Sequence, residues 1–276
     1  MPRRTQKPPA RTVRAGGLEP QATDSGPNGP ARTYRNARVW CKVYQGLHMA
    51  KPHETLEKVG LLRSLERNDR EIFERRCQWR HAHPKEWLLE QNDIGTDIYF
   101  LTSGVVRVLI TPSPDREVIL GDIEAGGYFG EMAAIDGQPR SAGILAITDA
   151  TIARMPAMAF REIIHKYPDV AEQLLLQLVS RIRTLDQRVN EFSSMHVKNR
   201  IYAELLRRSR PDPTDQRRAI VSPPPVHSDI AARVSTRREM VARELKALER
   251  AGFLTKRRGA FVLNNVPELM NMLHKD

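Results

Sequence analysis

The sequence predicts an α+β chain in which a jelly-roll-like β-roll, a long helix and a winged helix-turn-helix domain follow one another. Short apolar runs separated by glycine-containing turns fill residues 77–154, which is typical of an antiparallel roll. Apolar residues then recur every three or four positions over residues 170–192, as in one long helix. A short helix, a tight turn and a basic helix come next. We therefore place the roll at 49–166, the long helix at 167–197 and the winged domain at 198–276.

Composition excludes several classes of protein. The 276 residues, 40% of them hydrophobic, suffice for two modest domains with their own cores. No apolar run reaches the roughly eighteen residues of a membrane span, and the basic N-terminus lacks the apolar segment of a secretory signal. We therefore expect a soluble, cytoplasmic protein with no membrane partner. Cys41 and Cys77 are too few for a disulfide framework or for an iron–sulfur cluster held by four thiolates.

Charge is divided unevenly along the chain. Residues 1–48 have nine Lys/Arg and two acids, residues 49–197 eighteen and twenty-two, and residues 198–276 seventeen and nine, which gives +7, −4 and +8 of the total +11. A basic C-terminal module on an acidic body predicts a polyanionic partner that one end reaches, and nucleic acid is the usual one.

The first 48 residues are rich in Pro, Gly and Arg and show no helical or strand period, so we expect a disordered basic extension. The composition changes abruptly at Met49, and we expect Met49 to be the physiological initiator. The alternative is a basic tail that adds nonspecific affinity for DNA.

The predicted roll begins with two short amphipathic helices at residues 55–76. Strand-length apolar runs follow at Trp87–Leu89, Ile98–Leu101, Val105–Ile110, Glu117–Leu120 and Ile144–Ile147. A roll of such strands can enclose one small ligand.

A glycine-rich stretch, Gly126–Ala142, lies between the late strands and suits a phosphate. Its glycines permit close backbone approach, so that N–H groups can converge on an anion, and Arg140 and Ser141 add a positive fork and a hydroxyl. Glu131 would repel an anion unless it binds hydroxyl donors such as those of a ribose. A nucleotide satisfies both requirements. The alternative is an ordinary turn with Glu131 and Arg140 as a surface pair.

The pattern Phe-Gly-Glu-(apolar)-Ala followed by Arg-Ser-Ala resembles the phosphate-binding cassette of the cAMP receptor protein and FNR-like family of bacterial transcription factors. The resemblance implies that Glu131 binds the ribose 2′-hydroxyl and that Arg140 and Ser141 bind the cyclic phosphate. Asn92 replaces the family's first-turn Gly and tolerates a positive φ. The implied ligand-binding set is Gly130, Glu131, Met132, Ala133, Arg140, Ser141, Arg181, Leu185 and Asp186.

The long helix should begin at Pro168, which suits a first helical turn. Its apolar residues form one narrow stripe, close to a heptad seam: Val170, Leu174, Leu178, Ile182, Leu185, Val189 and Phe192. Such a stripe suits pairing with a second copy of the chain, and the resemblance implies a dimerisation helix here. The alternative is a helix packed on the roll.

The base specificity of the implied ligand is open. Where cAMP-specific members of the family have a Thr-Ser pair against the adenine, this chain has Leu185 and Asp186. A carboxylate accepts from the adenine amino group or from the N–H donors of guanine. We expect cAMP as the allosteric ligand, with cGMP possible, and no metal.

Residues 228–248 predict a helix-turn-helix with a charged second helix, which Ser235 or Thr236 can cap. Arg near its start can pair with guanine, and Glu accepts from cytosine. The resemblance implies reading of a TGTGA-like half-site. The alternative is a merely solvated face. The candidate DNA-binding residues are Arg238, Glu239 and Arg243 for bases, Arg237 beside them, and His227 and Ser228 for phosphates.

Taken with the resemblance, the sequence predicts a homodimeric regulator that binds double-stranded DNA under control of a cyclic nucleotide. The family implies RNA polymerase as a partner through the loop at 211–218, and an activator role, although repression is equally compatible with the residues. The second hypothesis is the same fold with cyclic di-GMP, haem or no ligand. His81 and His83 near Cys77 fit no standard zinc spacing. We expect no enzyme, because no nucleophile–base pair, metal triad or P-loop is present.

Overall fold

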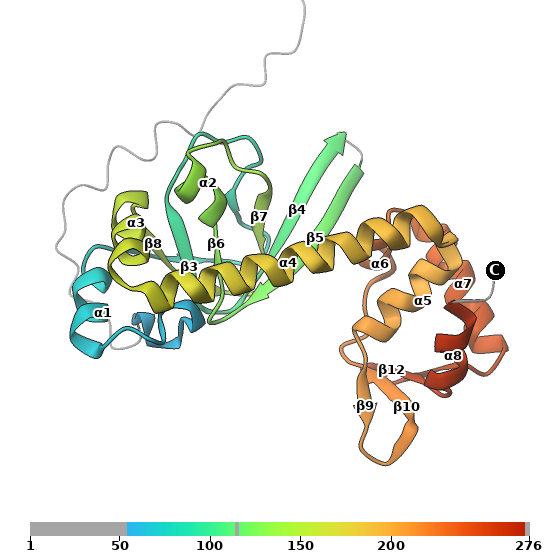
Figure 1. Cartoon of the computed structure of the whole chain (residues 1–276). Helices are drawn as coiled ribbons and strands as arrows, with labels where there is room; N and C mark the ends of the chain where they lie inside the picture. The colour runs from blue at the N-terminus through green and yellow to red at the C-terminus, as the bar shows by residue number, and fades with distance from the viewer. Residues whose placement is uncertain (1–53, 114–115, 274–276) are drawn as a thin grey trace, which may run out of the picture. The chain divides into compact units, whose positions relative to one another are not determined.

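The computed structural model describes residues 54–113 and 116–273 (Figure 1). The expected extension at 1–48 and the expected initiator Met49 lie outside the described residues.

The segment before the roll is only partly helical. It forms two 3₁₀ turns, η2 (Leu56–Lys58) and η3 (Gly60–Leu62), and then helix α1 (Arg67–Glu74). The expected first amphipathic helix is therefore replaced by two short turns, because Val59 between them is extended (φ −74°, ψ 112°). The apolar spacing is nevertheless used for burial. Leu56, Leu62 and Phe73 are at most 2% exposed in the first core of the roll.

Two four-stranded antiparallel sheets form the roll, with orders β1-β8-β3-β6 and β2-β7-β4-β5. The strands are β1 (Gln78–Ala82), β2 (Trp87–Leu89), β3 (Ile98–Ser103), β4 (Val105–Ser113), β5 (Arg116–Glu124), β6 (Tyr128–Phe129), β7 (Gly143–Ala146) and β8 (Ala150–Met155). Side chains alternate between faces along a strand, so Ile98 and Phe100 of β3 enter the core at 0% exposure. The predicted fold class, a β-roll followed by a long helix and a winged helix-turn-helix, is confirmed.

One helix lies within the roll, and a second connects the roll to the long helix. α2 (Glu131–Asp136) lies within the glycine-rich stretch, between β6 and β7, and α3 (Ala157–Lys166) follows β8. α2 and α3 contact each other, and Arg161 of α3 donates to the carbonyl oxygen of Ala134 at 2.8 Å.

The long helix, α4 (Pro168–Ser194), begins at Pro168 as expected. Its apolar seam divides into two parts. Val170 and Leu174 are buried at 0% and 4% exposure in the core of the roll, with Leu178 packed against it. From the next position the seam is open in the single chain. Its exposed members are Ile182, Leu185, Val189 and Phe192. Packing on the roll, the alternative reading, therefore applies to the first part of the helix, and pairing of the exposed part with a second copy stays a prediction.

The C-terminal domain packs helices on a four-stranded sheet of order β11-β12-β10-β9. Its elements are α5 (Val197–Arg207), β9 (Arg210–Asp212), β10 (Asp215–Val221), α6 (His227–Val234), α7 (Arg238–Arg250), β11 (Leu254–Arg257), β12 (Ala260–Leu263) and α8 (Val266–Leu273). The expected loop at 211–218 is instead mostly a β-hairpin, with its turn at Pro213–Thr214 between β9 and β10. In the described residues, no helix combines the length and apolar character needed to cross a bilayer.

Candidate functional site

The glycine-rich stretch folds into a strand end, a left-handed turn and a short helix. Gly130, the N-cap of α2, has φ +81°, which an L side chain rarely adopts. A Cβ there would lie 2.5 Å from Nη1 of Arg140 and 3.0 Å from the carbonyl oxygen of Asp97. A glycine is therefore required where the backbone passes the guanidinium.

Arg140 is a buried cation that makes no ion pair with a carboxylate among residues 54–113 and 116–273. It is 3% exposed, and its Nη1 and Nη2 donate to the carbonyl oxygens of Gly130 (3.0 Å) and Asp97 (2.7 Å). Its Nε is buried without a hydrogen-bond partner in the described structure, and its guanidinium lies 5.5 Å from the ring centroid of Tyr99. Burial lowers the pKa of Arg140. A desolvated guanidinium held only by carbonyl oxygens and a ring is suited to receive an anion.

Glu131 lies one residue after Gly130 and is also 3% exposed. Its Oε1 accepts from Nη1 of Arg181, on α4, at 2.5 Å. The side chain of Arg181 remains 48% exposed. The acid is thus held by a residue of α4.

One pocket gathers most of the predicted ligand-binding residues. Gly130, Glu131, Met132, Ala133, Arg140, Ser141 and Arg181 line it. Apolar side chains complete the wall: Leu89, Val108, Ile123, Phe129, Ala142 and Ile144. Leu185 and Asp186 do not line the pocket of this single chain, and their role stays a prediction.

Several groups that form the pocket or contact Arg140 were not predicted from the sequence. The carbonyl of Asp97 and the ring of Tyr99 come from β3 and the turn before it, far from the glycine-rich stretch in sequence. Strand alternation could have found Val108, which was assigned only to a strand, whereas Ile123 lies beyond the predicted run Glu117–Leu120. No sequence signal marks a backbone carbonyl as the partner of a particular Arg.

The two histidines considered for a metal are engaged elsewhere. His81 contacts Thr151 and Glu54 through its two ring nitrogens, and Nδ1 of His83 lies 3.0 Å from Asp149. Among residues 54–113 and 116–273, no group of three or more His, Cys, Asp or Glu is arranged to hold a metal.

The helix-turn-helix presents its charged face to solvent. Val241, Leu245 and Leu248 of α7 are buried at no more than 2% exposure. All four charged candidates are exposed: Arg237, Arg238, Glu239 and Arg243. Ser228 is exposed and His227 is half-buried, both in the first turn of α6.

The expected cap of α7 was wrong. The N-cap is Arg237, and it makes no side-chain capping bond. Ser235 instead closes α6, with the positive φ of +54° that the tight turn requires.

Two family models match the chain: the cyclic nucleotide-binding domain over residues 79–167 and the Crp-like helix-turn-helix domain over residues 199–272. The cAMP-activated global transcriptional regulator CRP of Escherichia coli O6:H1 is 30% identical over 177 residues, 61% of this chain and 81% of that protein. This chain belongs to the cAMP receptor protein and FNR family of bacterial transcription regulators. As a member, it is a DNA-binding regulator with a cyclic nucleotide-binding domain, and not an enzyme.

Relatives in sequence and neighbours in structure differ in what their names say they respond to. The cyclic AMP receptor protein of Thermus thermophilus is 32% identical over 164 residues, 59% of this chain and 72% of that protein. The c-di-GMP responsive global regulator CLP of Xanthomonas campestris has a TM-score of 0.61 at 22% identity, over 73% of this chain and all of the other. At that identity, the likeness to CLP shows the fold alone.

Proposed function

We propose that this Crp-family regulator is a homodimer whose DNA binding is controlled by a cyclic nucleotide, cAMP first and cGMP as the alternative. One observation carries the choice of ligand. Arg140, a buried guanidinium that no carboxylate of the described part of the chain pairs with, and Glu131, a buried carboxylate, line the same pocket. A cyclic phosphate matches the first, and a ribose 2′-hydroxyl matches the second. Ser141 adds an exposed hydroxyl beside them.

The proposed DNA site is a TGTGA-like palindrome. Arg238, Glu239 and Arg243 project from the start and middle of α7, where side chains of a recognition helix reach base edges in the major groove. His227 and Ser228 are proposed to contact phosphates, and Arg237 is a further proposed DNA contact. The exposed half of the α4 seam supports pairing of two copies, which would present two recognition helices to the two half-sites. RNA polymerase is the proposed further partner.

The central test replaces Arg140 by Ala. Charged hydrogen bonds contribute about 1.5–3 kcal/mol each, so we expect cyclic-nucleotide affinity to fall at least about tenfold in calorimetry. Nucleotide-stimulated binding to a TGTGA palindrome should disappear in gel shifts. Arg67→Ala removes an exposed guanidinium paired only with Glu71 and serves as the matched control. Undiminished stimulation of the Arg140→Ala protein would refute the assignment.

The ligand panel must contain cAMP, cGMP and cyclic di-GMP. Cyclic di-GMP is included because the structurally similar CLP is named for its response to it. Binding of cyclic di-GMP alone would keep the DNA-binding function and replace the proposed ligand. Because a carboxylate such as that of Asp186 can accept from the adenine amino group or from the N–H donors of guanine, the ratio of cAMP to cGMP affinity decides the base preference.

A further inference from the structure

The β4–β5 hairpin has two faces with different partners. Arg107 and Asp122 are directly opposite each other in the β4–β5 register. Their neighbours Val108 and Ile123 line the nucleotide pocket. Because successive side chains of a strand point to opposite faces, the hairpin is a wall of the pocket on one side and carries an ion pair on the other.

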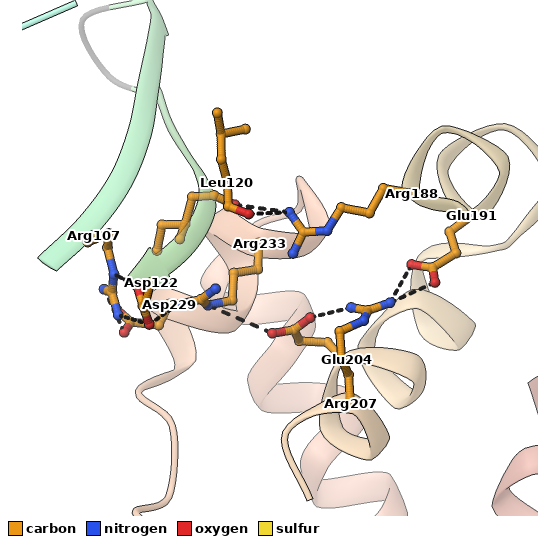
Figure 2. A network of polar contacts seen from close by, with 10 residues as sticks. Arg107, Leu120, Asp122, Arg188, Glu191, Glu204, Arg207, Asp229 and Arg233 are labelled. Atoms are coloured by element: carbon orange, nitrogen blue, oxygen red, sulfur yellow. Dashed lines mark hydrogen bonds and ion pairs between the residues drawn. The ribbon is translucent and has the colours of Figure 1, made fainter. Parts of the chain in front are cut away.

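The face of the hairpin that carries the ion pair contacts α6, the first helix of the helix-turn-helix (Figure 2). Arg107 donates to Asp122 (2.8 Å) and to Asp229 of α6 (2.8 Å). Arg233, one turn further along α6, donates to the same Asp122 at 2.5 Å. A separate contact joins Arg116 of β5 to the hydroxyl of Ser235, in the turn before α7. We call Arg107, Arg116, Asp122, Asp229, Arg233 and Ser235 the latch.

Further pairs fix the latch to the end of α4. Nε of Arg233 lies 3.8 Å from Glu204 of α5, and Arg207 bridges Glu204 (2.5 Å) and Glu191 (2.6 Å). Arg188 of α4 donates to the carbonyl oxygen of Leu120 in β5 at 3.0 Å. Figure 2 shows this network running from the hairpin through α6 and α5 to α4.

The latch is partly desolvated, unlike an ordinary surface pair. The side chains of Arg233 and Arg107 are only 6% and 13% exposed, and that of Asp122 is 26% exposed. Exposed pairs contribute little to stability, whereas removing one partner from a buried pair leaves an unpaired charge at substantial cost. The position of α6 against the hairpin is therefore held by specific partners.

We propose that the latch is an autoinhibitory contact that holds α6 and the turn before α7 away from DNA until ligand in the pocket displaces the hairpin. The first helix of a helix-turn-helix crosses the DNA backbone, and the second enters the groove by its N-terminal end. Asp229 is in the first turn of α6, and Ser235 lies just before α7. The hairpin and a DNA duplex therefore compete for this edge of the domain.

The inference rests on the proposed function for the identity of the ligand that would displace Val108 and Ile123, whereas the contacts of the latch do not depend on it. A ligand that contacts these side chains acts on the two residues next to Arg107 and Asp122. Ligand binding in the pocket can therefore change the contacts of the DNA-binding domain within one chain. A coupling of this kind changes affinity by roughly 5–150-fold.

The test is Arg107→Ala in the full chain. We expect ligand-free affinity for a TGTGA palindrome to rise about tenfold, and stimulation by cAMP to shrink by the same factor. Loss of a positive charge by itself lowers affinity for DNA, so a rise cannot be a simple charge effect. Arg116→Ala, at an exposed side chain, tests the second contact with little risk to folding. Arg76→Ala, which removes a pair with Glu162 on the roll, is the control.

A second measurement needs neither DNA nor nucleotide. Hydrogen exchange at the amides of residues 227–236 should accelerate in Arg107→Ala and stay unchanged in Arg76→Ala. If the wild type ignores nucleotides but Arg107→Ala shows faster exchange and tighter DNA binding, the proposed ligand fails and the latch stands. If exchange and ligand-free DNA affinity match the wild type in both latch variants, the latch is refuted, whatever the nucleotides do.

Discussion

Two glycines flank α2, and both adopt the left-handed conformation, yet only one of them touches the pocket. Gly130 (φ +81°) and Gly137 (φ +72°) would each strain an alanine by about 1–2 kcal/mol. A Cβ at Gly130 meets Nη1 of Arg140 at 2.5 Å, whereas a Cβ at Gly137 meets nothing within 4 Å. The pair therefore separates backbone strain from displacement of the guanidinium.

At the residue scale we predict that Gly130→Ala weakens nucleotide binding at least about tenfold and that Gly137→Ala leaves it within about twofold, because only the first moves Arg140. Both should lose about 1–2 kcal/mol of unfolding free energy from strain, with a further loss for Gly130→Ala. Calorimetric titration and urea unfolding of the two variants supply the readouts. Equal nucleotide affinity in the two variants would contradict this account of Gly130.

The residue types of the pocket could be predicted from the sequence, but their hydrogen-bond and ion-pair partners could not. Glu131, Arg140 and Arg181 were expected as ligand contacts, and the structure brings them to one pocket. The pairing of Glu131 with Arg181 was not foreseen, because it depends on how α4 crosses the roll. Pattern alone states which groups are present, whereas their partners depend on tertiary packing.

At the scale of elements, α4 illustrates the same limit. Its period predicts a helix with one apolar stripe, but the period does not show that the stripe packs within the chain at Val170 and is exposed from Ile182 onward. The hairpin β9–β10 was taken for a loop because its prolines and charges resemble turn composition. The cap of α7 was misplaced because Ser235 is used one step earlier, to end α6.

The exposed half of α4 yields a prediction about assembly. Val189 is 63% exposed in the single chain, and in a paired helix it would be buried against its copy. Val189→Glu should therefore shift the protein toward monomer by at least about tenfold in dissociation constant, because two carboxylates would meet in an apolar seam. Analytical ultracentrifugation measures the shift.

Asn190→Glu is the control for Val189→Glu, since it adds the same charge at the next, polar position. A monomeric Asn190→Glu, or a Val189→Glu protein that dimerises like the wild type, would argue against this seam as the dimer interface.

At the scale of the whole molecule, the ion pairs between the β4–β5 hairpin and α6 should stabilise the fold only within a certain pH range. Burial by itself would raise the pKa of Asp122, but hydrogen bonding to Arg107 and the charge of Arg233 outweigh it and lower the pKa overall. A carboxyl with a depressed folded-state pKa contributes stability above its unfolded value, about 3.9, and loses it as pH falls through the folded value.

We therefore predict that the difference in unfolding free energy between wild type and Asp122→Asn is constant from pH 8 to 5. It should decrease only below about pH 4. Urea unfolding at several pH values measures it. A difference that already declines between pH 7 and 5 would show that Asp122 is not held as the latch requires.

The two-faced β4–β5 hairpin has a consequence for engineering a sensor. Substitutions that reshape the wall at Val108 and Ile123 and substitutions that tune the grip at Arg107 and Asp122 occupy alternate positions of the same strands. In a biosensor built from this chain, variants at Val108 and Ile123 would change which molecule is detected, and variants at Arg107 and Asp122 would change the background signal in its absence. Each library of variants therefore randomises only two positions.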